Sequence, residues 1–138
     1  MPLQIREVGQ PYIAHRSGAA SQDAAAIVGF IRIMELWGAS NSQMRRILGS
    51  PPERTFYVWK AGRVKRLPED TLRRIGYVAG VFKALQMLYS DAAQADAWIS
   101  KPNRYFAGQS PMERMAAGDV TDLAAVRNYV DAARAPWS

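Results

Sequence analysis

The chain has 138 residues, 49% of them hydrophobic and none of them cysteine, which is enough for one domain or for two small helical units with a shared core. The lack of cysteine excludes disulfides, thiolate metal sites and a cysteine nucleophile, and it suits a reducing cytoplasm. The single histidine, His15, argues against a catalytic zinc site, and glycine-rich phosphate-binding motifs and a Gly-x-Ser-x-Gly nucleophile motif are absent from the sequence. No apolar run approaches the roughly 18 residues of a membrane-spanning helix. We therefore expect no enzymatic activity, no cofactor, no metal and no membrane segment.

The formal net charge of +6 is concentrated in one part of the chain. Residues 42–75 hold nine Lys and Arg against three Asp and Glu, a balance of +6, whereas the residues on either side are balanced. A basic surface confined to one region is typical of proteins that bind a polyanion. The alternative is a solvated basic face with no partner.

Residues 1–21 are predicted to form an N-terminal arm. Leu3 and Ile5 alternate with polar residues, but the run is too short to indicate a strand. The arm either becomes ordered against a partner or stays loose.

The first helix is predicted over Gln22–Trp37, with Ser21 or Asp23 as its cap. Its apolar residues recur three or four positions apart, which indicates one buried face rather than a cofactor site. These residues are Ile27, Phe30, Ile31, Met34 and Trp37.

The sequence from Asn41 to Gly62 has the pattern of a helix-turn-helix. Asn41 or Ser42 is expected to cap the first of its helices, and Gly49 is expected to end it because glycine adopts positive φ without steric cost. The second helix is predicted from about Pro52 to Lys60, with Phe56 and Trp59 in the core. In a helix-turn-helix the second helix enters the major groove of DNA.

The candidate DNA-binding residues divide by chemistry. Three lie at the start or on the outer face of the second helix, where side chains reach base edges, and six more are basic residues expected to contact phosphates. The first group is Arg54, Thr55 and Tyr57, and the second is Arg45, Arg46, Lys60, Arg63, Lys65 and Arg66. Pro51 and Pro52 stiffen the first turn of the second helix, and Glu53 either accepts from a cytosine amino group or weakens the contact with phosphate. DNA binding is therefore less strongly supported than toxin binding. A helix-turn-helix of this size seldom reads DNA as a monomer, so we expect a homodimer.

A long helix is predicted over Pro68–Tyr89, since acids in its first turn oppose the helix dipole. Gly76 and Gly80 lie within it, and they either allow close helix contact or cost about 1 kcal/mol each relative to alanine. Shorter helices are predicted over Asp91–Ile99, from a capping box at Ser110 to Gly118, and from Asp119 onward. The expected fold is all-α, with an arm (1–21), a helix-turn-helix region (22–66) and a long helix with a small helical domain (67–138).

The C-terminal string from Lys101 to Ser138 resembles the toxin-binding domain of the Xre/MbcA/ParS antitoxins. The residues that carry the resemblance are Trp98 and Ile99, Asn103, the pair Tyr105 and Phe106, Gly108, Ser110-Pro111 and Gly118. The preceding helix-turn-helix resembles the Xre-type module, through Leu48-Gly49 and the string Arg54-Thr55-Phe56-Tyr57. The resemblance covers about residues 22–138.

The resemblance implies an antitoxin of a type II toxin-antitoxin system. Such proteins neutralise a RES-domain toxin that consumes NAD or transfers ADP-ribose, by blocking its active site with their C-terminal segment. They also repress their own operon through the helix-turn-helix, and they are not enzymes. The implied partners are therefore a cognate RES-domain toxin and operator DNA, in a larger complex in the cytoplasm.

The chain's last residues contain groups suited to a nucleotide pocket, since arginine and a carboxylate pair with charged groups and tryptophan fills a flat slot. The candidate toxin-binding residues are Asn128, Tyr129, Asp131, Arg134, Trp137 and Ser138. The alternative is that Trp137 covers the chain's own core and the tail is passive. Two other functions stay open: a stand-alone helix-turn-helix regulator without a toxin partner, and a small helical adaptor whose basic face contacts RNA or protein.

Overall fold

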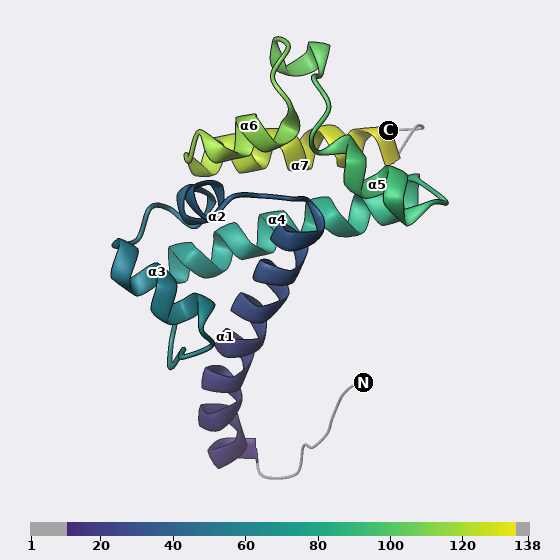
Figure 1. Cartoon of the computed structure of the whole chain (residues 1–138). Coiled ribbons are helices and arrows are strands. Elements are labelled where there is room, and N and C mark those ends of the chain that lie inside the picture. Colours follow the sequence, from purple (N-terminus) through teal and green to yellow (C-terminus); the bar gives the residue numbers. More distant parts are fainter. Residues whose placement is uncertain (1–10, 135–138) are drawn as a thin grey trace.

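A computed structural model describes the backbone of residues 11–134 and the side chains of residues 20–134 (Figure 1). Within these residues every regular element is helical, which confirms the predicted all-α class. The elements are α1 (Pro11–Leu36), α2 (Asn41–Ile47), α3 (Glu53–Lys60), α4 (Glu69–Leu88), α5 (Ala92–Trp98), the short 3₁₀ helix η1 (Arg104–Phe106), α6 (Pro111–Ala116) and α7 (Val120–Arg134).

The start of the first helix was predicted wrongly. Helix α1 begins at Pro11 rather than at Gln22, and its first turns extend away from the other helices (Figure 1). Proline is well suited to a first helical position, and the alanines that follow favour a helix despite the Gly and Ser among them. Ser21 and Asp23 therefore lie inside the helix and cannot cap it.

Helices α2 and α3 form the predicted helix-turn-helix. The cap of α2 is Ser40, not Asn41 or Ser42: its hydroxyl accepts from the backbone N–H of Gln43 at 3.1 Å, and the Gln43 side chain accepts from the Ser40 N–H at 2.9 Å. This reciprocal pair is a capping box. Helix α3 begins at Glu53, with Pro52 as its N-cap residue.

The long helix α4 packs against three of the other helices. Helices α1, α5 and α7 all contact it, and α7 lies along it in the same direction (Figure 1). The connection α5–η1–α6 carries the chain back so that α7 can begin beside the start of α4. The helix-turn-helix is held by other helices, since α2 packs against α6 and α3 packs against α1.

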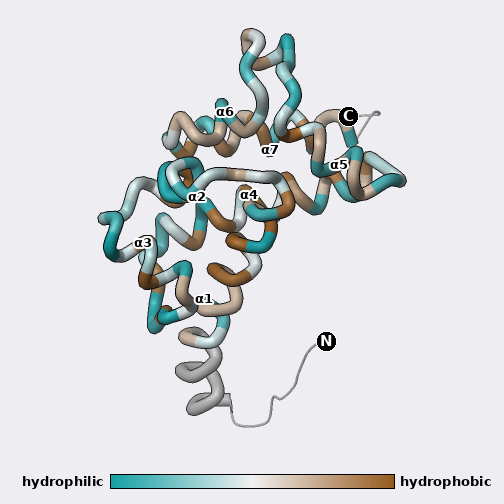
Figure 2. The backbone as a smooth tube through the Cα atoms, in the orientation of Figure 1, coloured by the Kyte–Doolittle hydropathy of each residue, from teal (hydrophilic) through white to brown (hydrophobic). Residues whose placement is uncertain are grey.

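The hydrophobic core is continuous through these helices. Hydrophobic segments are concentrated where α1, α3 and α4 meet (Figure 2), and the core extends to the inner face of α7. The predicted core residues Phe56 and Trp59 are 1% and 9% exposed, and Leu123, Val126 and Val130 of α7 are all buried. The apolar face predicted for the first helix is also confirmed, since Ile27, Phe30, Met34 and Trp37 are buried.

None of the helices within residues 11–134 combines the length and the apolar character that crossing a bilayer would take.

Candidate DNA-binding and toxin-binding surfaces

The turn between α2 and α3 has two residues in the left-handed region. Gly49 has φ 96° and Ser50 has φ 58°, so glycine is required at the first position and the second carries local strain. The guanidinium of Arg45 donates from Nε to the carbonyl of Pro51 at 2.6 Å. Arg45 was predicted to contact phosphate, and in the structure it holds the turn that leads into α3.

Helix α3 separates a buried face from an exposed one. Phe56 and Trp59 are buried against the core, whereas Arg54 and Tyr57 are exposed and Thr55 is partly so. The Tyr57 ring is supported edge-on by Phe56, with centroids 5.1 Å apart. The three residues predicted to face DNA bases are thus all accessible on α3.

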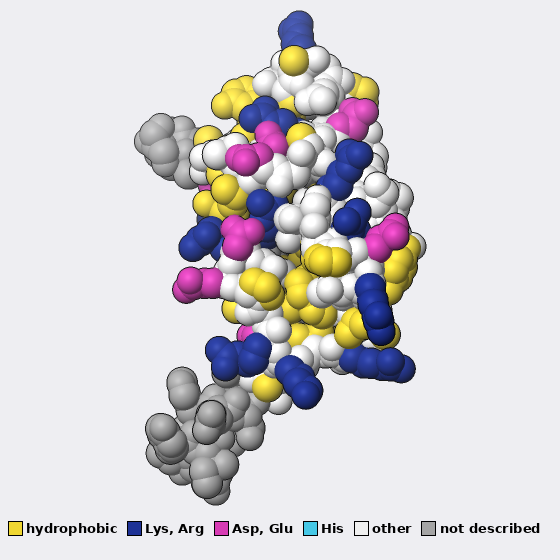
Figure 3. Space-filling view, turned by 90° about the vertical axis from the view of Figure 1, so that its left-hand side faces the viewer, with side chains coloured by type: hydrophobic (Ala, Val, Ile, Leu, Met, Phe, Trp, Pro, Cys, Tyr) yellow, Lys and Arg dark blue, Asp and Glu magenta, His cyan; other side chains and the backbone are white. Residues whose placement is uncertain are grey.

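The other predicted phosphate-binding residues surround this helix. Arg46, Arg63, Lys65 and Arg66 are exposed and Lys60 is half-buried. Figure 3 shows Lys and Arg side chains around exposed hydrophobic side chains on the side of the molecule where α2 and α3 lie. The Lys60 ammonium donates to the side-chain oxygen of Asn41, which links the end of α3 to the start of α2.

Asp23 has a structural role that the sequence did not reveal. Its carboxylate is buried and accepts from the backbone N–H of Leu67 at 2.7 Å, and Arg66 Nε lies 3.7 Å away. This contact fastens the basic loop between α3 and α4 to the first helix. The loop that carries Arg63 and Lys65 is therefore anchored at its far end.

Arg74, one of the nine basic residues in the stretch 42–75, is buried. Its Nε donates to Asp70 at 2.7 Å, and its Nη1 donates to the carbonyl of Gly118 at 2.7 Å and to that of Ile47 at 3.3 Å. Gly49 lies directly against the guanidinium, and a Cβ at that position would be 3.0 Å from Nε. One side chain thus joins the end of α2, the start of α4 and the turn before α7.

The turn between α6 and α7 is fixed by local hydrogen bonds. Asp122 accepts from the Arg114 guanidinium at 2.9 Å and from the Asp119 N–H at 3.0 Å. The hydroxyl and backbone N–H of Thr121 both donate to Asp119, and these bonds hold the pKa of the Asp119 carboxyl below its usual value. At the other end of α6, Ser110 and Glu113 form the predicted capping box.

Four aromatic rings meet where α5, η1 and α7 come together. Tyr129 stacks on Trp98, with centroids 5.8 Å apart and planes 12° apart, and its ring lies 4.8 Å from that of Tyr105 and 5.5 Å from that of Phe106. Phe106 is buried, whereas Tyr105 is 67% exposed. Tyr129 was predicted to belong to the C-terminal segment that blocks the toxin's active site. In the structure its ring supports that of the exposed Tyr105.

The other predicted toxin-binding residues lie on or beyond the last turns of α7. Asn128 and Arg134 are exposed, and Asp131 pairs with Arg127 at 2.9 Å. Arg134 also lies 2.8 Å from the Met87 sulfur at the end of α4. Trp137 and Ser138 lie outside the described residues.

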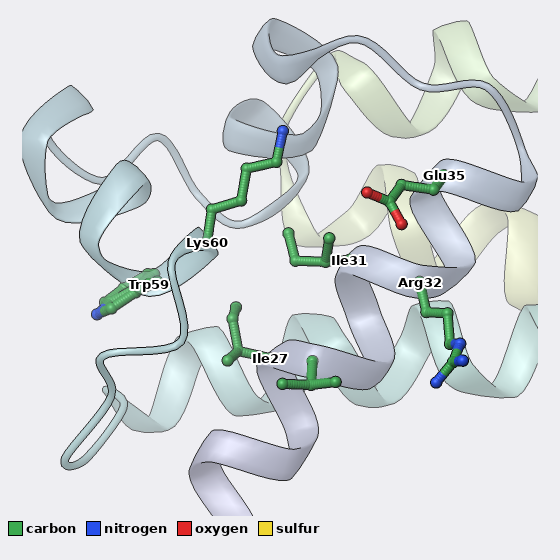
Figure 4. Close-up of a pocket in the computed structure, with 7 residues that line it drawn as sticks. Ile27, Ile31, Arg32, Glu35, Trp59 and Lys60 are labelled. Atoms are coloured by element: carbon green, nitrogen blue, oxygen red, sulfur yellow. The ribbon is translucent and has the colours of Figure 1, made fainter.

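A groove of about 270 Å³ lies between α1 and α3. Figure 4 shows Ile27 and Ile31 at its centre, with Arg32 and Glu35 of α1 on one side and Trp59 and Lys60 of α3 on the other. Its lining is mixed and no group of three His, Asp or Glu side chains in the described part of the chain is placed to hold a metal.

Comparison with known proteins assigns both halves of this molecule. Residues 16–80 match the antitoxin Xre-like helix-turn-helix domain, and residues 84–135 match the antitoxin Xre/MbcA/ParS C-terminal toxin-binding domain. The first match ends and the second begins within α4.

The chain belongs to the Xre/MbcA/ParS antitoxins, a family that is not enzymatic. It is 38% identical over 124 residues to the uncharacterized protein y4oB of Sinorhizobium fredii (strain NBRC 101917 / NGR234), a match that covers 86% of this chain and 95% of the relative. No solved structure matches it significantly. The protein is thus an antitoxin with a toxin partner and a DNA-binding helix-turn-helix.

Proposed function

We propose that this antitoxin neutralises a RES-domain toxin, one that consumes NAD or transfers ADP-ribose from it, by placing its C-terminal segment in the toxin's active site. The observation that carries this proposal is the toxin-binding domain over residues 84–135, which ends where α7 leads into the last residues of the chain. Those residues include Trp137, an aromatic group suited to a flat slot in a nucleotide pocket.

The same protein represses its own operon in this proposal. Support comes from α3, which exposes Arg54 and Tyr57 while Phe56 and Trp59 hold it to the core. The net charge of residues 42–75 supplies the attraction to phosphate that most DNA binding requires. We assign residues 22–66 to DNA binding and residues 67–138 to toxin binding, with the complex acting in the cytoplasm.

The antitoxin is proposed to act as a homodimer, with α1 in the interface. Val28 and Leu36 are large apolar residues of α1 that are 52% and 55% exposed, and the groove between α1 and α3 adjoins Val28. Exposed apolar residues beside a groove are a common feature of subunit contacts. Light scattering should give twice the monomer mass, and the substitution Val28→Glu should return the protein to a monomer with unchanged helicity.

The experiment that tests the function is growth rescue. The open reading frame next to the gene for this chain, which we propose encodes the RES-domain toxin, is induced in a host cell with and without the antitoxin, and growth and cellular NAD are followed. We expect growth arrest with loss of NAD, and recovery of both when the antitoxin is present. If the neighbouring protein is toxic and the antitoxin does not restore growth, the proposal is contradicted. The alternative of a stand-alone helix-turn-helix regulator is then left.

A further inference from the structure

A short segment between α5 and α6 stands away from the helical body. It leaves after Ile99, forms η1 and returns at Ser110, so that it projects above α6 and α7 (Figure 1). It is closed at its base, where the Asn103 N–H donates to the Gln109 carbonyl at 3.0 Å and the Gly108 N–H donates to the Asn103 carbonyl at 3.0 Å. We refer to residues 100–109 as the projecting loop.

The loop holds one side chain in a fixed and exposed position. The Asn103 side chain accepts from the Tyr105 N–H at 2.8 Å, and Ala107 adopts the left-handed region at φ 57°, a conformation that costs roughly 1 kcal/mol for a residue other than glycine. Tyr105 remains 67% exposed although its ring contacts Phe106 and Tyr129. An exposed aromatic ring on a braced loop has little conformational entropy left to lose on binding.

Beside this ring is an apolar groove. The groove has a volume of about 270 Å³ and is lined mainly by Leu88, Tyr89, Trp98 and Tyr129. Tyr129 is shared, since it forms part of the groove wall and also supports Tyr105. Ala133, in the last turn of α7, also lines the groove. The groove therefore lies next to the point where the chain leaves α7.

We propose that Tyr105 and this groove form a second contact with the toxin, separate from the C-terminal segment, in which the groove receives a bulky apolar side chain of the toxin. This inference rests on the proposed function. The occupant follows from position, because Tyr105 and every residue of the groove lie within the residues that match the toxin-binding domain, 84–135. Tyrosine and tryptophan anchors beside pockets are the usual centres of binding energy in protein interfaces.

The two contacts have different roles in this proposal. The braced loop and groove supply affinity, while the segment after α7 reaches the toxin's active site and supplies inhibition. Because both lie at the same end of α7, docking at the groove raises the effective concentration of the tail at the toxin's pocket. Tyr129 then acts as a positioning residue for Tyr105 rather than as a member of a free tail.

The test uses calorimetry to measure binding of the full-length antitoxin to a catalytically inactive variant of its toxin, the RES-domain partner of the proposed function. The substitution Tyr105→Ala should weaken binding about 30-fold, the loss typical of a central aromatic anchor, and Tyr105→Phe should restore most of it. Leu88→Asp, which places a charge in the groove at a residue that is 37% exposed, should weaken binding to a similar degree.

The matched control is Tyr57→Ala, which removes an exposed tyrosine of α3 that is 49% exposed. This variant should bind the toxin with unchanged affinity and bind DNA more weakly. Tyr105→Ala should instead bind the toxin more weakly and bind DNA with unchanged affinity. If the unaltered antitoxin binds the toxin and both Tyr105→Ala and Leu88→Asp bind within twofold of it, the second contact is disproved and the proposed function stands. If the unaltered antitoxin binds no toxin, the proposed function fails and the second contact fails with it.

Discussion

The guanidinium of Arg74 donates from Nη1 to the carbonyl oxygen of Gly118 across 2.7 Å. These residues are 44 positions apart in the chain, one near the start of α4 and the other in the turn before α7. The same Nη1 reaches the Ile47 carbonyl at the end of α2. The two functional halves of the antitoxin are therefore joined by one buried arginine.

Replacing Arg74 by methionine should destabilise the protein by about 2–4 kcal/mol, because hydrogen bonds from a charged donor contribute roughly 1.5–3 kcal/mol. Its partner Asp70 is 53% exposed, so the substitution leaves no buried charge. The matched control is Arg73→Met. Arg73 is exposed and pairs with the same aspartate at 3.6 Å, a contact worth about 0–1 kcal/mol. Urea unfolding of the two variants measures the difference, and equal midpoints would contradict a structural role for Arg74.

The glycines of α4 differ in what surrounds them, which resolves the two alternatives left open by the sequence. At Gly76 an added Cβ would meet nothing within 4 Å, whereas at Gly80 it would lie 2.1 Å from Nη1 of Arg127. Gly76→Ala should therefore stabilise the protein by about 0.5–1 kcal/mol, the difference in helix propensity. Gly80→Ala should gain less or lose stability, because Arg127 must move and its ion pair with Asp131 is disturbed. Thermal unfolding of the pair is the measurement, and a larger gain at Gly80 would contradict this account.

The helices and their buried faces were predictable because they depend on local periodicity. Ile27, Phe30 and Met34 repeat at helical spacing and are buried, and the Ser110 capping box is complete within four residues. Local signals predicted the starts of the helices less well. Helix α1 begins at Pro11 rather than at Gln22, and Ser40 caps α2 in place of Asn41 or Ser42.

The long-range roles of charged residues could not be predicted in the same way. Arg74 is a basic residue among other basic residues, and its carbonyl partners lie 27 and 44 positions away. Asp23 likewise binds a backbone N–H that is 44 positions distant. The sequence alone carries no sign of such pairs, because the partners are backbone groups that every residue possesses. The role of Tyr129 as support for Tyr105 was missed for a related reason, since it depends on how a loop folds back onto α7.

Operator binding should separate the basic residues by role. Arg63→Gln removes an exposed charge from the loop after α3, so the slope of log affinity against log salt should fall by about 1 while sequence preference is unchanged. Arg54→Gln should instead relax the preference at one base position, at a cost of about 1–3 kcal/mol against the preferred operator. Titrations at several salt concentrations, with operator and scrambled duplexes, measure both effects.

The control for charge alone is Arg104→Gln. Arg104 is exposed on the projecting loop, far from α3 in Figure 1, so the same change in net charge should leave the slope unaltered. If all three variants lowered the slope equally, binding would depend on net charge rather than on a site centred on α3.

Removing the residues after Arg134 should abolish neutralisation while leaving the fold intact. A longer deletion from Asn128 would be a poor test, because Val130 is 1% exposed and Tyr129 belongs to the aromatic cluster, so the protein would lose part of its core. A chain that ends at Arg134 keeps all of α7. Its melting temperature and its operator affinity should therefore match those of the full chain, and it should still bind the toxin through Tyr105 and the groove.

In cells that express the toxin, this shortened antitoxin should fail to restore growth and NAD, because nothing then occupies the toxin's active site. The full-length variant Trp137→Ala should give partial rescue if the indole fills the base-binding slot. Full rescue by the chain that ends at Arg134 would show that docking on the helical domain alone is sufficient to inhibit, and the C-terminal plug would have to be abandoned.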